Sequence, residues 1–277
     1  MPTWSYDELT KASVLFSVSE EIMQMRWFII GGITRYVLEK DDEDLDELIN
    51  ESIPELDISK INRIASGLLV GQKELSHRII HFLVNTNTYM SRTLQMGSSY
   101  ISEKVVQALV ESQHEDLINF FKLSHNNPIL CTVRGNLFEA YAHRQLMKGG
   151  EFSIRSLSDQ EGHEVKSMSI KPMKMERFLQ LTVCKNNDVY YIPWVPNYPC
   201  IDAYNPRIGY FQMTIAKSHP IKETTRENLY FVVPRENFKD FGLQHLETTE
   251  SDSTRKKRKP NQEKALPKQF VLCINIK

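Results

Sequence analysis

Residues 199–216 read PCIDAYNPRIGYFQMTIA, and they indicate the architecture of the chain's second half more clearly than any other stretch. Asn205, Pro206 and Gly209 are typical turn residues, and the runs on both sides of them are rich in apolar residues. Two such runs joined by a short turn predict a β-hairpin.

The expected turn fixes which residues of the hairpin face each other. If it centres on Arg207, residue 205 pairs with 209, 203 pairs with 211, and Asp202 lies opposite Gln212. Thr214 shares the face of Gln212, because side chains along a strand alternate with a period of two. Apolar side chains of the second strand point to the other face, into a core: Phe211, Met213 and Ile215.

Asp202 needs an explanation, because a carboxylate in an apolar strand is costly unless something compensates its burial. Bound Mg²⁺ is one explanation, since this hard cation takes oxygen ligands, and the side chains of Asp202 and Gln212 would supply two of them. A hydrogen bond to the neighbouring strand or loop is the other explanation. The spacing alone leaves both open.

The sequence around this hairpin predicts a domain of one helix followed by several strands. Residues 133–147 predict an amphipathic helix that stops at Gly149 and Gly150. Short β-rich runs predict strands at 152–157, 178–184, 189–194, 200–204, 210–216, 229–233 and 270–276. A polar, charged stretch at roughly 246–268 predicts a disordered insert. The pattern is typical of an α/β (α+β) fold with a mixed sheet flanked by helices.

The first half of the chain predicts a mostly helical region. Apolar spacing predicts helices over residues 7–30, 58–70 and 101–123. The β-branched residues of 76–84 favour a strand. A break at Asn126-Asn127-Pro128 predicts two domains, residues 1–127 and 128–277.

Charge divides the chain at the same place. Residues 1–127 hold 11 Lys and Arg against 19 Asp and Glu, a balance of −8, and residues 128–277 hold 23 against 16, a balance of +7. A basic half suggests a polyanionic partner. The alternative is a solvated surface with uneven charge.

Composition is that of an ordinary globular protein, with 41% hydrophobic and 25% charged residues. No run of about 18 apolar residues predicts a membrane span, and the first residues lack the basic and then apolar pattern of a signal peptide. The 4 cysteines have no CxxC spacing, which favours reduced thiols over a zinc site or a disulfide framework.

Four segments of the second half follow in the order RGNLFEAYAH, PCIDAY, FQMTIAKSHPIK and LYFVVP. Together they resemble the nuclease-like domain of Crinkler-type effectors and retrotransposon-hot-spot-like proteins, in the PD-(D/E)XK or restriction-endonuclease-like superfamily. The resemblance covers roughly residues 128–240 and the last strand. It implies a restriction-endonuclease-like fold and Mg²⁺-dependent hydrolysis of nucleic acid, with DNA as the expected substrate.

The resemblance also implies the residues of the site. Glu139 matches the acidic residue of the GxxFE helix, Asp202 the strand aspartate, and Gln212 and Thr214 the Q-x-T form of the third motif. Glu139, Asp202 and Gln212 would hold the metal, which polarises the phosphate and activates water. Lys217 completes the expected catalytic set.

Two further cations follow the hairpin, His219 and Lys222, and with Lys217 they are candidates for phosphate contacts. A single Lys or His after a strand is more often simply solvated.

Two departures from the family pattern favour a second hypothesis. Thr214 stands where the usual members keep a lysine that orients the nucleophile, and the connection between HPIK and LYFVVP is short. The second hypothesis is therefore a catalytically inactive, nucleus-directed effector that keeps the fold and binds DNA or a host protein.

In the first half, WSYDEL and RWFIIGGITRYVL resemble the end of the ATPase module that precedes this nuclease-like domain in relatives. Arg35 occupies the position of a nucleotide-sensing arginine. Gly31 and Gly32 equally fit a helix C-cap and a turn. Without a GxxxxGK[ST] phosphate loop, this region is expected to be a remnant that binds no ATP.

A cluster of five consecutive cations lies within the predicted insert: Arg255, Lys256, Lys257, Arg258 and Lys259. It fits an importin-type nuclear signal or a nonspecific nucleic-acid contact, and a solubilising loop is the bland alternative. We favour the nuclear signal. It predicts a nuclear import receptor as a partner and the nucleus as the location, that of a host cell after secretion.

Overall fold

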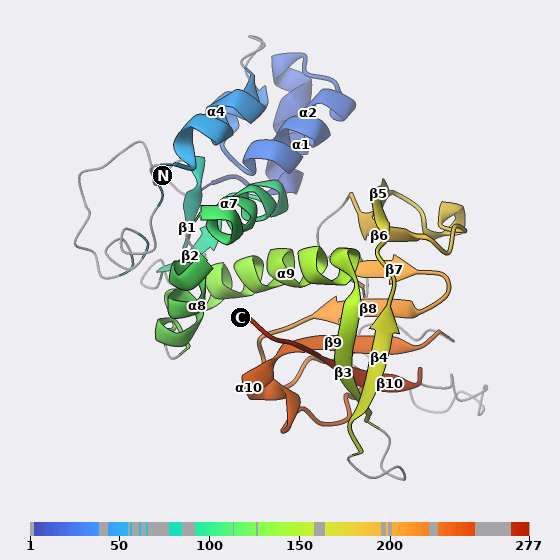
Figure 1. The fold of residues 1–277 in the computed structure, drawn as a ribbon. Coiled ribbons are helices and arrows are strands. Elements are labelled where there is room, and N and C mark those ends of the chain that lie inside the picture. Colours follow the sequence, from blue (N-terminus) through green and yellow to red (C-terminus); the bar gives the residue numbers. More distant parts are fainter. Residues whose placement is uncertain are drawn as a thin grey trace, which may run out of the picture. The chain divides into compact units, whose positions relative to one another are not determined.

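A computed structural model shows a mixed α/β protein, as the sequence predicts (Figure 1). The structure describes residues 3–38, 44–54, 56, 61, 65, 78–84, 92–112, 114–125, 127–157, 164–194, 198, 201–221, 227–246 and 267–276. The chain divides into two compact units, Met1–Tyr141 and Ala142–Lys277. Helix α9 (Cys131–Lys148) crosses this division, and the domain boundary near residue 127 stays a prediction.

The first unit starts with two helices where the sequence predicts one over residues 7–30. In the capping box of α1 (Tyr6–Phe16), Ser5 Oγ accepts the Glu8 N–H and the Glu8 carboxylate accepts the Ser5 N–H. Ser17, with φ 57°, ends α1, and the Ser19 side chain caps α2 (Glu20–Ile30). The single-helix prediction is wrong because these local caps outweigh the continuous apolar spacing.

Gly31 ends α2, and its backbone conformation and surroundings explain why a glycine occupies this position. Its φ is 71°, and its N–H donates to the Trp27 carbonyl oxygen at 2.8 Å. A Cβ at this position would lie 2.0 Å from the Gly97 carbonyl oxygen. The helix C-cap expected at Gly31 is therefore confirmed.

Among its described residues, the first unit also contains α3 (Thr34–Leu38), α4 (Leu45–Ser52), α7 (Ser99–Ser112), α8 (His114–Leu123) and an antiparallel pair of strands, β1 (Ile80–Val84) and β2 (Arg92–Met96). The strand expected within 76–84 is confirmed for Ile80–Val84, whereas β2 escaped prediction because RTLQM is largely polar. The single helix expected over 101–123 is wrong, since α7 and α8 are separate. The helix expected over 58–70 lies outside the described residues, apart from Ile61 and Ala65.

The second unit is built on an eight-stranded sheet in the order β4-β3-β10-β9-β8-β7-β6-β5. Its pairs β5 with β6, β8 with β9 and β9 with β10 are parallel and the others are antiparallel, so the sheet is mixed, as expected. The strands are β3 (Gly150–Ser156), β4 (Lys166–Ile170), β5 (Lys174–Phe178), β6 (Val189–Pro193), β7 (Ala203–Asn205), β8 (Gly209–Met213), β9 (Leu229–Pro234) and β10 (Gln269–Ile274). A short helix, α10 (Arg235–Phe238), follows β9.

One strand prediction is wrong and β4 was not predicted, each for a physical reason. The strand expected over 178–184 is wrong, because β5 ends at Phe178 and a 3₁₀ turn, η1 (Leu181–Val183), follows. Two of its apolar residues are surface residues, Leu179, 57% exposed, and Val183, 64% exposed. β4 escaped prediction because KSMSI, an edge strand, carries little apolar signal. No helix of the described residues is long and apolar enough to cross a bilayer.

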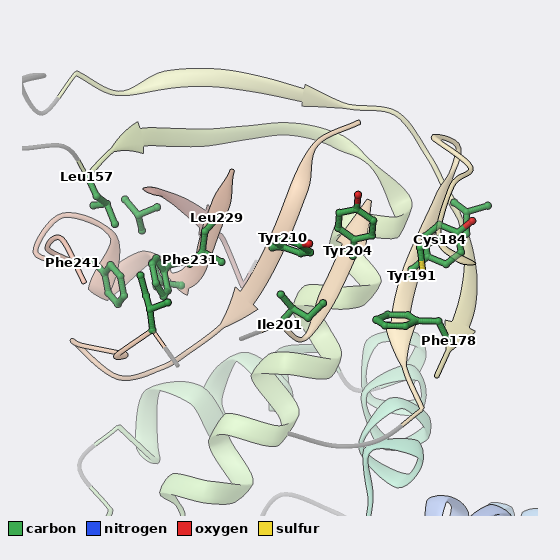
Figure 2. Packing of buried hydrophobic residues seen from close by; sticks show 14 residues of the cluster. Leu157, Phe178, Cys184, Tyr191, Ile201, Tyr204, Tyr210, Leu229, Phe231 and Phe241 are labelled. Atoms are coloured by element: carbon green, nitrogen blue, oxygen red, sulfur yellow. The ribbon is translucent and has the colours of Figure 1, made fainter. Parts of the chain in front are cut away.

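Both faces of the sheet's centre are buried, so β8 is buried along its whole length. On one face an aromatic row runs across the strands through Tyr190, Phe211, Tyr230 and Phe270, with neighbouring ring centroids 5.0 to 5.7 Å apart. On the other face a second core forms from 14 buried residues, with Tyr204, Tyr210 and Phe231 among them (Figure 2). Phe211 and Met213 are buried as expected, and Ile215 is only partly buried.

Candidate functional site

The hairpin that carries the expected site has the predicted register. Asn205 pairs with Gly209 and Ala203 with Phe211. Asp202 directly precedes this pairing, and its backbone N–H donates to the Phe211 carbonyl oxygen at 2.9 Å. Its Oδ2 accepts the Met213 N–H at 2.6 Å. One of the two explanations for Asp202, a hydrogen bond to the neighbouring strand, is therefore present.

Gln212 is the polar residue of β8, and its side chain is only 5% exposed. Its Nε2 lies 2.6 Å from Nε2 of His219. Its Oε1 is buried and has no hydrogen-bond partner among the described residues. A buried acceptor without a donor costs about 1–3 kcal/mol, so this oxygen calls for an explanation.

His219 is held by a network that reaches the last strand. Its backbone N–H donates to Gln244 Oε1 at 2.6 Å. The Gln244 N–H donates to Gln269 Oε1 at 2.9 Å, and Gln269 Nε2 donates back to the Gln244 carbonyl oxygen at 3.0 Å. Gln244 and Gln269 are 5% and 4% exposed, so the network is buried. It fixes the backbone that carries His219 beside Gln212.

Thr214 follows β8 and is 7% exposed. Its N–H donates to the Val232 carbonyl oxygen at 3.0 Å, and its Oγ1 accepts the Ala216 N–H at 3.0 Å. The hydroxyl therefore closes the turn after the strand. Lys217 lies just beyond this turn and is exposed.

The remaining predicted site residues lie in the first unit or outside the described residues. Glu139 is a partly buried residue of α9 in the first unit, and its place at this centre stays a prediction. Lys222 and the basic cluster 255–259 lie outside the described residues, as does most of the insert expected over 246–268.

The structure thus brings Asp202, Gln212 and Thr214 to the end of one hairpin and adds His219 and Gln244 to them. The sequence offered His219 only as a phosphate contact. Gln244 escaped notice altogether, since it lies 25 residues from His219 along the chain and no motif marks it.

The oxygen donors at this hairpin suit a hard divalent cation. Mg²⁺ prefers carboxylate and amide oxygens; the hairpin carries the carboxylate of Asp202 and the buried Oε1 of Gln212. Within the described part of the chain, no three His, Cys, Asp or Glu side chains gather as a metal-binding set. A cation at this hairpin would therefore depend on the amide oxygen of Gln212 as well as on carboxylates.

Other candidate groups have structural roles. His143 is 4% exposed, and its Nδ1 lies 2.9 Å from the Tyr190 hydroxyl, so it packs α9 onto the sheet within the second unit. Burial raises the pKa of the Cys184 and Cys273 thiols to about 11, which makes them poor nucleophiles. In the first unit, the guanidinium of exposed Arg35 lies over the Tyr36 ring, 4.5 Å from its centroid.

The chain was compared with known proteins. The chain is similar to Crinkler effector proteins, as its sequence segments predict. It is 23% identical over 261 residues to Crinkler effector protein 15 and 25% identical over 272 residues to Crinkler effector protein 16, both of Phytophthora infestans. Each match covers 87% of this chain and 42% of the relative, so the chain spans about two fifths of the length of the curated relatives it matches. No family model and no solved structure matches.

Proposed function

We propose that the second unit is the nuclease-like domain of an effector protein, and that it hydrolyses phosphodiester bonds of nucleic acid, with DNA as the substrate, using Mg²⁺. The observation that carries this proposal is the buried Oε1 of Gln212, which lacks a donor among the described residues and belongs to the residue before Met213, whose N–H the Asp202 carboxylate accepts. A cation would give the amide oxygen of Gln212 a partner, whereas a purely structural role leaves this oxygen unexplained.

In this proposal each residue of the site has a defined role. Asp202 and Gln212 would supply oxygen ligands, and Glu139 is the further carboxylate that the family resemblance implies. When bound, Mg²⁺ would polarise the scissile phosphate and lower the pKa of the attacking water. Exposed Lys217 would contact the phosphate backbone, with Lys222 beside it in sequence. The buried Thr214 shapes the turn that presents Lys217.

The effector part of the proposal rests on the names of the two relatives, both Crinkler effector proteins. We propose that this chain acts in the nucleus of a host cell after secretion, and that an import receptor binds residues 255–259. The first unit would be a remnant of an ATPase module in which Arg35 keeps the position of the nucleotide-sensing residue. It would not bind ATP by itself, since the sequence has no phosphate loop.

Cleavage tests the proposal. Purified protein is incubated with plasmid and with single-stranded DNA, in Mg²⁺ or in EDTA, beside Asp202→Asn. This variant keeps an acceptor for the Met213 N–H and removes the charge. The exposed Asp188→Asn serves as the matched control. We expect Mg²⁺-dependent cleavage by the wild type and the control, and none by Asp202→Asn. Cleavage by all three proteins alike would point to a contaminant and against the site.

One observation favours the second candidate, a protein that keeps the fold and binds DNA or a host protein without cutting. Thr214 replaces the usual lysine, and its hydroxyl already accepts the Ala216 N–H. Mg²⁺-dependent stabilisation of the wild type without any cleavage would support this candidate, because a ligand stabilises the state that binds it.

A further inference from the structure

The contact between Gln212 and His219 affects how the side-chain amide of Gln212 is oriented. The two ends of a carboxamide are nearly equal in shape but opposite in function, since the nitrogen only donates and the oxygen only accepts. In Gln212 the nitrogen lies 2.6 Å from His219 Nε2, and the oxygen has no partner among the described residues. Because the group is planar, holding the nitrogen fixes the direction of the oxygen.

Neighbouring residues hold His219 in place, so its imidazole can restrain the Gln212 amide. The backbone of His219 is tied to Gln244, and Gln244 is tied to Gln269 of β10 by a reciprocal pair of hydrogen bonds. The His219 ring also lies near the Phe231 ring, with centroids 6.5 Å apart. A network that ends on β10 therefore holds the backbone of His219 and places its ring beside Gln212.

We propose that His219 is a positioning residue that holds the nitrogen of the Gln212 carboxamide, so that Oε1, and not the NH₂ group, is offered to the divalent cation. This inference rests on the proposed function. Without His219 the amide can rotate by half a turn and present an NH₂ group, which repels a cation. His219 thus acts through Gln212 and touches neither the substrate nor the metal.

A double-mutant cycle tests the inference, with Mg²⁺ binding to the full chain measured by calorimetry. His219→Ala weakens Mg²⁺ binding about threefold to tenfold, the size of one neutral hydrogen bond. In Gln212→Glu both ends of the side-chain carboxylate are oxygens, so its orientation no longer matters. Adding His219→Ala to this variant therefore causes no further loss of Mg²⁺ affinity. His219→Gln restores an acceptor for the Gln212 nitrogen and recovers most of the affinity. The exposed His245→Ala is the matched control and leaves the affinity unchanged.

The outcomes separate this inference from the proposed function. An equal loss of affinity from His219→Ala in both backgrounds would overturn the positioning role and leave the metal site standing. No Mg²⁺ binding by the wild type would overturn both. If His219→Ala fails to fold, nuclear magnetic resonance of the wild type decides. A scalar coupling between Gln212 Nε2 and His219 Nε2 supports the inference, and its absence in well-resolved spectra contradicts it.

Discussion

Oδ2 of Asp202 accepts the backbone N–H of Met213 at 2.6 Å, a bond that ties the start of the hairpin to the end of its second strand. The aspartate therefore helps to hold the strands in register, and in the proposed site it also carries the charge that holds a cation. These two roles can be separated, because the amide of asparagine keeps an acceptor and loses the charge.

Asp202→Ala should destabilise the protein even without metal, because it leaves the Met213 N–H without its acceptor. The expected loss in the free energy of unfolding is about 1–3 kcal/mol. Asp202→Asn should lose clearly less. Urea unfolding in EDTA measures both variants. Equal losses would show that charge, and not hydrogen bonding, accounts for the structural role.

Replacement by methionine, a residue of similar volume, should destabilise the protein more at Gln244 than at Gln212. Gln244→Met loses an acceptor for the His219 N–H and a donor to the Gly242 carbonyl oxygen, and should cost about 2–4 kcal/mol. Gln212→Met removes an oxygen without a partner among the described residues, together with the contact of Nε2 with His219, and should cost about 1 kcal/mol. Unfolding in EDTA compares the two. A loss from Gln212→Met as large as that from Gln244→Met would contradict the difference in their hydrogen bonds.

Gly31→Ala should destabilise the first unit, since the residue has a φ of 71° and a Cβ would lie 2.0 Å from the Gly97 carbonyl oxygen. We expect a loss above about 2 kcal/mol. Gly242→Ala is the control, because nothing lies within 4 Å of its Cβ position. Thermal unfolding of both variants checks this. A neutral Gly31→Ala would argue against its role as the helix stop.

Cys184 and Cys273 should resist alkylation at pH 9 in the native protein, because burial raises the pKa of both thiols to about 11 and keeps them protonated. The unfolded thiols ionise near 9.0, so these groups favour the folded state below that pH, and this contribution is lost as pH rises from 9 to about 11. Peptide mass spectrometry after iodoacetamide treatment, with and without urea, measures the labelling. Rapid native labelling of either cysteine would contradict its burial.

The hairpin could be predicted because its determinants are local. Asn205 and Pro206 specify a turn, and Gly209, with φ 131°, is needed where a Cβ would lie 2.4 Å from the Asn228 carbonyl oxygen. Turn position and strand alternation together give the register, and the observed pairs Asn205 with Gly209 and Ala203 with Phe211 agree with it.

What the sequence could not predict depends on contacts between distant segments. The nitrogen of Gln212 lies beside His219, and Gln244 reaches His219 and Gln269 over 25 residues in each direction. Leu179 and Val183 gave a false strand because apolar residues also occur on the surface. Ser17 and Ser19 divided a helix whose apolar spacing continues through them.

The central claim is that a divalent cation lies between Asp202 and the amide oxygen of Gln212. The most direct measurement is anomalous diffraction from crystals of the wild-type protein soaked in millimolar Mn²⁺, a probe with the same preference for oxygen ligands. We predict a peak within coordination distance of Asp202 and Gln212 Oε1 that is absent in Asp202→Asn. No peak at this hairpin, in crystals whose other Mn²⁺ sites are occupied, would contradict the account.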